Sequence, residues 1–126
     1  DAASAIYPKE VSGNEIKPLE GESFLKAITG RNWQRNAPIF WEHEGSRAMR
    51  DGQWKIVSEV GRGWEIYNMD EDRTELRNLV ETEGSRLTAM KSSYEDWARR
   101  CEVEAWPVPP LTWNPKMRAP HAHRSA

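Results

Sequence analysis

The 126-residue sequence has little of what usually identifies a function. It holds one cysteine, Cys101, which cannot form a disulfide within the chain and leaves the redox compartment open. No apolar run is long enough to cross a bilayer. The net charge is only -2, with 18 basic residues scattered among 20 acidic ones, and lacks the basic patch of a nucleic-acid binder. We therefore expect neither a membrane nor a nucleic acid as a partner.

Signatures of catalysis are missing as well. The sequence contains no G-x-S-x-G, no G-x-x-x-x-G-K-[ST] and no G-x-G-x-x-G pattern. Cys101 falls on the apolar stripe of an expected helix, where a buried, inert thiol is more common than a nucleophile. We predict no catalytic residue in this chain.

A metal site is not supported either. His43-Glu44 could begin an H-E-x-x-H zinc helix, but position 47 is arginine and the segment has the pattern of a strand end. A looser cluster of residues 42–44 with His121 and His123 is conceivable, although most His-x-His tails are solvated. We predict no metal ligand and no cofactor in this chain.

Tryptophan is the residue type that stands out. Seven tryptophans occur in a chain of which 30% is charged, so the apolar surface is concentrated in a few large side chains. A length of 126 residues is enough for one domain with a modest core. Four aromatic residues in the expected strands could form a platform for sugar rings, although in a small domain they more often form the core or half of an interface. They are Phe40, Trp41, Trp54 and Trp64.

Local patterns divide the chain into three parts. Residues 1–21 mix prolines, glycine and charges without periodicity, which predicts an extended connector. Residues 22–103 form the expected folded subdomain, which opens with a two-turn helix between an N-cap at Ser23 and a left-handed stop at Gly30. Residues 104–126 form a proline-rich tail, whose Trp106 and Trp113 suggest that it lies against a surface.

Strand patterns fill residues 38–69. Asp51-Gly52 between two apolar runs is a strong hairpin signal, because both turn positions favour positive φ. Period-2 alternation places two sets of three residues on shared faces. The first set is Trp54, Ile56 and Ser58, and the second is Trp64, Ile66 and Asn68. We expect an antiparallel meander of three to four strands, at residues 39–41, 47–50, 54–60 and 64–69.

Two helical segments are expected after the meander. Thr74 is a plausible N-cap for a short turn through Leu76 and Leu79. A long helix begins near Ser85, because apolar residues recur at spacings of three and four and so form one stripe. These residues are Leu87, Met90, Tyr94, Trp97 and Cys101. Packed on the meander, this helix gives an α+β fold.

Several stretches together resemble the C-terminal subdomain of bacterial arylsulfatases, which are formylglycine-dependent enzymes of the alkaline-phosphatase-like superfamily. The resemblance covers residues 18–103. Its most specific elements are W-E-H-E-G-x-R-A-x-R, D-G-x-W-K and W-E-[IL]-Y-[ND]-x-[DE]-x-D-x-T-E-L-x-[ND]-L. The flanking stretches PLEGESFLKAITG and YEDWARRCEV add to it.

The resemblance implies a two-part enzyme of which this chain is the smaller, C-terminal part. Calcium and formylglycine are then expected in a separate N-terminal catalytic domain, which is the expected partner together with the sulfate-ester substrate. The modification motif C/S-x-P/A-x-R is absent here, since Cys101 precedes Glu102-Val103-Glu104. The parent would hydrolyse sulfuric esters and be periplasmic or secreted, and the chain itself would not be catalytic. The identity of the ester stays open, and a start at Asp1 rather than Met suggests a processed chain or a fragment.

The resemblance also gives a role to residues 42–47. It implies that their turn lies at the rim of the substrate cleft, so that His43, Glu44 and Arg47 contact the non-reacting part of a substrate. Two alternatives remain open. A Glu42–Arg50 or Glu44–Arg47 ion pair could merely pin a hairpin, and the chain could be a stand-alone, tryptophan-rich module that binds carbohydrate or protein.

Overall fold

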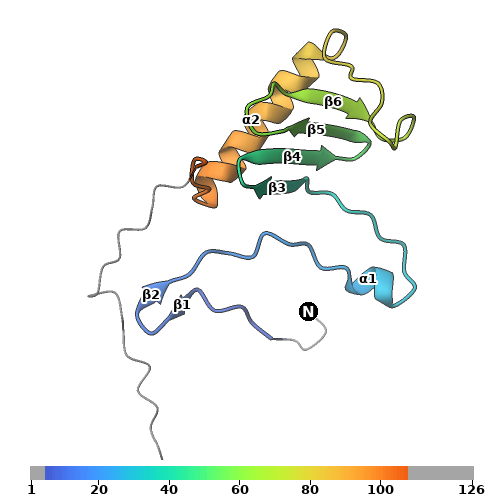
Figure 1. Ribbon diagram of the computed structural model, residues 1–126. Coiled ribbons are helices and arrows are strands. Elements are labelled where there is room, and N and C mark those ends of the chain that lie inside the picture. The colour runs from blue at the N-terminus through green and yellow to red at the C-terminus, as the bar shows by residue number, and fades with distance from the viewer. Residues whose placement is uncertain (1–4, 108–126) are drawn as a thin grey trace, which may run out of the picture.

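The computed structural model describes residues 5–107, and the structural statements below concern this range. Figure 1 shows a sheet with a long helix across one face, preceded by an extended arm. The fold is α+β, as the sequence predicts. The elements in chain order are β1 (Glu10–Val11), β2 (Asn14–Glu15), α1 (Leu25–Ile28), β3 (Ile39–His43), β4 (Ser46–Asp51), β5 (Trp54–Ser58), β6 (Glu65–Asn68) and α2 (Gly84–Arg100).

The sheet is an antiparallel meander in the order β3-β4-β5-β6. One row of directly opposed residues crosses all four strands on the face toward α2, and it consists of Phe40, Met49, Ile56 and Ile66. A hairpin follows β4 as predicted, but its turn residues are Gly52 and Gln53, one position later than Asp51-Gly52, because Asp51 ends β4 and pairs with Trp54. Gly52 takes φ +55°, and Asp51 does not take a positive φ. The predicted strands exist, although β3 and β4 run further than expected and β5 stops earlier, at Ser58.

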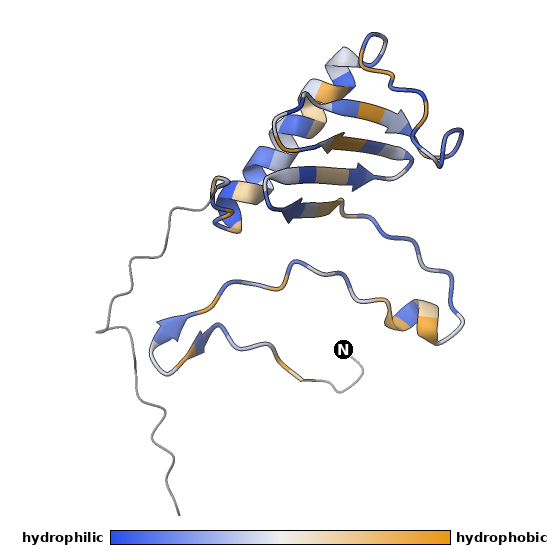
Figure 2. Cartoon of the chain, viewed as in Figure 1, coloured by the Kyte–Doolittle hydropathy of each residue, from blue (hydrophilic) through white to orange (hydrophobic). Residues whose placement is uncertain are grey.

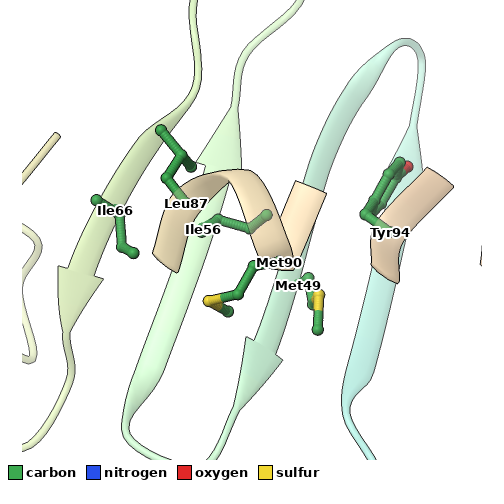
Figure 3. Packing of buried hydrophobic residues seen from close by; sticks show 6 residues of the cluster. All are labelled: Met49, Ile56, Ile66, Leu87, Met90 and Tyr94. Atoms are coloured by element: carbon green, nitrogen blue, oxygen red, sulfur yellow. The ribbon is translucent and has the colours of Figure 1, made fainter. Parts of the chain in front are cut away.

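The core lies between the sheet and α2. Figure 3 shows side chains from three strands and from the helix meeting there, namely Met49, Ile56, Ile66, Leu87, Met90 and Tyr94. Hydropathy alternates along the strands in Figure 2, because one face is covered by the helix and the other is not. The predicted stripe of α2 is confirmed at Leu87, Met90 and Tyr94, which are buried, and at Trp97, which packs against the core.

The segment after β6 corrects one prediction. Residues 74–79 form no helical turn, and Thr74 caps nothing. Instead the Asp72 carboxylate accepts hydrogen bonds from the backbone N–H groups of Leu76 (3.1 Å) and Arg77 (2.7 Å). These two bonds hold the pKa of Asp72 below its usual value. An aspartate-centred loop therefore replaces the predicted helix.

The N-terminal arm contains more structure than a connector. Residues 10–15 form the β1–β2 hairpin, whose turn residues Ser12 and Gly13 have φ of +53° and +81°. The helix α1 is a single turn rather than two, although Ser23 Oγ accepts the N–H of Leu25 at 3.3 Å and Gly30 takes φ +73° as expected. Within residues 5–107 no helix has the length and apolarity that a bilayer crossing requires.

Two ion pairs attach the arm to the end of α2. Arg100 Nε and Nη2 donate to the two carboxylate oxygens of Glu20 at 2.9 and 2.8 Å, and Lys17 Nζ lies 2.8 Å from Glu102. The Arg100 guanidinium lowers the pKa of Glu20. All four side chains are largely exposed, so these pairs orient the arm more than they stabilise it.

Candidate functional site

The predicted rim residues lie on two different faces. His43 ends β3 and is exposed, and strand alternation places it on the face away from α2. Glu44 is exposed at the tip of the β3–β4 turn, where its φ is +51°. These two side chains are accessible to a neighbouring molecule.

Arg47 points the other way, toward α2. Its Nη2 donates to Ser58 Oγ at 3.3 Å, and its Cζ lies 4.8 Å from the centre of the Trp64 ring. Its Nε is buried and has no hydrogen-bond partner among residues 5–107. The structure therefore separates Arg47 from His43 and Glu44.

The β3–β4 turn is held by a contact that the sequence did not reveal. Glu42 Oε1 accepts the backbone N–H of Gly45 at 2.8 Å. The register pairs Glu42 with Arg47 and Ile39 with Arg50, and the ion pairs of the described residues include neither Glu42–Arg50 nor Glu44–Arg47. The carboxylate of Glu42 thus fixes the turn through the backbone instead of through a salt bridge.

The four strand aromatics do not form one platform. Phe40, Trp54 and Trp64 pack against the core, where Phe40 stacks on Trp97 with ring centres 5.0 Å apart. Trp41 lies on the opposite face with 46% of its surface exposed. A sugar platform built from all four is therefore wrong, and the core interpretation holds for three of them.

Metal and cofactor predictions gain little from the structure. Residues 5–107 contain no group of three or more His, Cys, Asp or Glu side chains placed to hold a metal ion. His121 and His123, which the looser cluster required, lie outside the described residues, as does Trp113. Cys101 caps the C-terminal end of α2. Calcium and formylglycine in a separate domain remain predictions.

A pocket that sequence reasoning missed lies on the α2 side of the β3–β4 hairpin. It measures about 470 Å³, and its lining includes Glu42, Arg47, Tyr94 and Trp106. Burial is the main reason why the pKa of Tyr94 is raised to about 12. The positive charge of Arg47 lowers this pKa and the negative charge of Glu42 raises it, each by less than burial does. No sequence signal marks this pocket, because Arg47 and Tyr94 meet only after α2 crosses the sheet.

Position 45, in the β3–β4 turn that lines one side of the pocket, requires a glycine. Its φ of +82° disfavours any side chain. A Cβ atom at this position would also come within 2.9 Å of Trp106 Cβ. The turn and the segment after α2 therefore pack against each other backbone to ring.

No family model matches the chain. Among solved structures, the crystal structures of Ps i-CgsB, alone and in complex with k-i-k-neocarrahexaose, are similar to it at 24% sequence identity and a TM-score of 0.49. Each match covers 60% of this chain and 18% of the other, so the chain spans less than a fifth of that protein's length. No residue role is transferred from this likeness.

Proposed function

We propose that the chain is the C-terminal part of an arylsulfatase, which packs on a separate catalytic domain, helps to shape the substrate cleft and has no activity alone. The observation that carries this proposal is the row of exposed apolar side chains along the arm. Ile6 is 93% exposed, Leu19 69%, Phe24 58% and Ile28 68%. Leu19, Phe24 and Ile28 line one hollow of the arm. Exposed apolar side chains that lie together in this way favour a surface that another domain covers.

The sheet supplies a second surface for the same partner. Its face away from α2 carries the exposed ring of Trp41, opposite the small Ala48. The sheet under a long helix also agrees with the architecture that the sequence resemblance implies. Together these features favour a supporting subdomain over a stand-alone binding module.

The exposed end of the β3–β4 hairpin is the part that we assign to the cleft rim. His43 and Glu44 project there, and neither side chain hydrogen-bonds to the described residues. A histidine beside a carboxylate can hold the non-reacting part of a sulfate ester by hydrogen bonds. Such remote contacts add binding and orientation, and the bond is broken elsewhere.

The chain by itself is expected to behave as a domain without its partner. We expect it to self-associate in sedimentation velocity, to bind the dye ANS, and not to hydrolyse 4-nitrophenyl sulfate. Phe24→Ser/Ile28→Ser should strongly reduce self-association, because it removes apolar surface from the arm. The matched control is Val60→Ser/Leu76→Ser, which removes two exposed apolar side chains outside the arm. A monomeric chain that binds no dye would favour the stand-alone module instead.

The rim assignment has a kinetic test in the full-length enzyme. His43→Ala should lower kcat/KM for a bulky sulfate ester about tenfold, the effect of losing one good hydrogen bond, and leave 4-nitrophenyl sulfate nearly unchanged. Gln53→Ala, at the exposed turn at the other end of the sheet, serves as the control. Equal losses on both substrates would argue against a contact with the remote part of the substrate.

A further inference from the structure

One edge of the sheet is uncovered among residues 5–107. The order β3-β4-β5-β6 makes β3 and β6 the two edge strands, and Figure 1 shows β3 on the side nearer the arm. The outer side of β6 is in use, since Ile66 O accepts the N–H of Leu79 at 2.9 Å and the Ile66 N–H donates to Asn78 Oδ1 at 3.2 Å. Within the same range β3 has no comparable neighbour on its outer side. An unpaired strand edge is a template for another strand.

The β3–β4 turn identifies the residues of β3 whose backbone groups face outward. The two-residue turn Glu44-Gly45 closes on His43 and Ser46, and in such a hairpin the closing pair exchanges both of its backbone hydrogen bonds. Antiparallel alternation then turns the N–H and C=O groups of Phe40 and Glu42 away from β4. Neither residue makes a further backbone hydrogen bond to residues 5–107. These four groups can pair with one more strand.

A groove of about 600 Å³ lies beside the first half of β3. Its lining includes Gly21 of the arm, Phe40 of β3 and Trp97 of α2. Glu20 and Arg100 also line it, and they bind each other through two hydrogen bonds. An extended segment with apolar side chains therefore suits this groove better than a charged ligand does.

The C-terminal tail starts at the turn end of the same edge. Trp106 packs on the β3–β4 turn, where a Cβ atom at Gly45 would come within 2.9 Å of Trp106 Cβ. Five residues of extended chain span up to about 17 Å. A position opposite Glu42 requires less, namely one strand spacing of about 4.8 Å and about 10 Å back along β3. The residues that follow Trp106 are therefore numerous enough to reach the edge.

One stretch of the tail has the pattern of a strand. Residues 111–114 read L-T-W-N, which alternates apolar and polar side chains. In an antiparallel register with Leu111 opposite Glu42, Trp113 falls opposite Phe40. Opposed residues share a face of the sheet, so both apolar side chains turn to the α2 side, where the groove lies. A shift by one residue would turn them to the other face.

The prolines of the tail fit the same register. Pro110 falls at a position whose backbone nitrogen points away from β3, so its missing N–H costs no hydrogen bond there. Pro115 falls opposite Pro38, and because neither residue has an N–H the pairing ends at this point. At the other end Pro109 falls opposite Glu44, which already belongs to the turn.

We propose that residues 111–114 of this chain add to the sheet as a fifth strand, antiparallel to β3 and seated in the groove beside it. Leu111 and Trp113 exchange backbone hydrogen bonds with Glu42 and Phe40, and the Trp113 ring covers the groove. The added strand closes the edge that would otherwise pair with other chains. This inference joins two parts of one chain and does not rest on the proposed arylsulfatase function.

The test compares amide hydrogen exchange by NMR in the 126-residue chain and in a chain that ends at Pro107. The amides of Phe40 and Glu42 should exchange at least about tenfold more slowly in the full chain, because a hydrogen-bonded amide exchanges only when its bond opens. The amide of Trp41 points to β4 and should exchange equally in both. A nuclear Overhauser contact between the Hα atoms of Trp41 and Thr112 should identify the register, since this pair is opposed without hydrogen bonds.

Two proline substitutions form a matched pair. Leu111→Pro removes an N–H that points to β3, so the protection of Phe40 and Glu42 should be lost. Thr112→Pro removes an N–H that points away from β3, and exchange should stay within about twofold of the parent chain. Neither position belongs to the core between the described sheet and α2, so the Trp41 amide should report an intact sheet in both variants.

Three results would overturn the proposal. The first is equal exchange of the Phe40 and Glu42 amides in the full and the shortened chain. The second is an equal effect of Leu111→Pro and Thr112→Pro. The third is protection that increases with protein concentration, which would assign the edge to a second copy of the chain. Each of these outcomes leaves the kinetic test of His43→Ala unaffected, so the two proposals can fail separately.

Discussion

Ile56→Ala is expected to lower the free energy of unfolding by about 3–4 kcal/mol, which is a large part of the stability of so small a domain. Ile56 has no exposed surface, and it occupies the centre of the row that faces α2. Alanine would leave a cavity there that sheet and helix can only partly close. Urea unfolding followed by circular dichroism measures the loss.

The neighbouring residue provides the control. Val57 lies on the same strand but points to the opposite face, where it is half-buried. Val57→Ala should lower the free energy of unfolding by only about 1 kcal/mol, because folding removes less apolar surface from water at this position. Equal losses at positions 56 and 57 would contradict a core confined to the α2 side. If the two substitutions cost equal stability only in a longer chain, a partner domain in that chain would cover the face of the sheet away from α2.

Stability should fall steeply between pH 10 and pH 12. Burial raises the pKa of Tyr94 from 10.0 to about 12, and burial together with the carboxylate of Glu65 raises that of Tyr67 further. In this window the folded chain binds more protons than the unfolded chain, so unfolding becomes easier as the pH rises. Below pH 10 both hydroxyl groups are protonated, and their contribution to the free energy of unfolding is fully present.

Two substitutions measure how much of the loss of stability at alkaline pH comes from each tyrosine. Urea midpoints measured from pH 8 to pH 12 should decline less in Tyr94→Phe and less in Tyr67→Phe, and least in the double variant. Between pH 8 and pH 9 neither hydroxyl titrates, so each variant should keep a constant midpoint there. If Tyr94→Phe declined as steeply as the parent chain, its hydroxyl would not be buried as described.

The meander and α2 were predictable because local signals agree with one another. Asp51-Gly52 marks a turn, and the alternation of Trp54, Ile56 and Ser58 identifies the face that the helix covers. The 3- and 4-residue spacing of Leu87, Met90 and Tyr94 identifies the matching face of α2. Each signal depends only on neighbours along the chain, so no tertiary information was needed.

Two features could not be predicted from the sequence. In one, two residues compete for the same capping role, and the other joins residues that are distant in the chain. Asp72 and Thr74 are both good capping residues, and only the path after β6 decides that Asp72 accepts the backbone N–H groups of Leu76 and Arg77. The family resemblance places Arg47 at the rim together with His43, and strand alternation turns the two side chains to opposite faces of the sheet. Contact of Arg47 with a substrate stays a prediction. The pocket joins residues 47 and 94, and no periodic pattern predicts where a helix crosses a sheet.

The two-residue turn at Glu44-Gly45 has a consequence for how the hairpin can vary. Both turn residues have positive φ, so the turn adds no bulge and the pairing of Glu42 with Arg47 is maintained. Changes at His43 or Glu44 therefore alter the outward side, and changes at Arg47 alter the inward side. One additional residue in the turn would exchange the two sides along β4 and would place the core residue Met49 in solvent. Selection can thus tune each side by substitution, while insertions and deletions at this position should be rare among relatives of the chain.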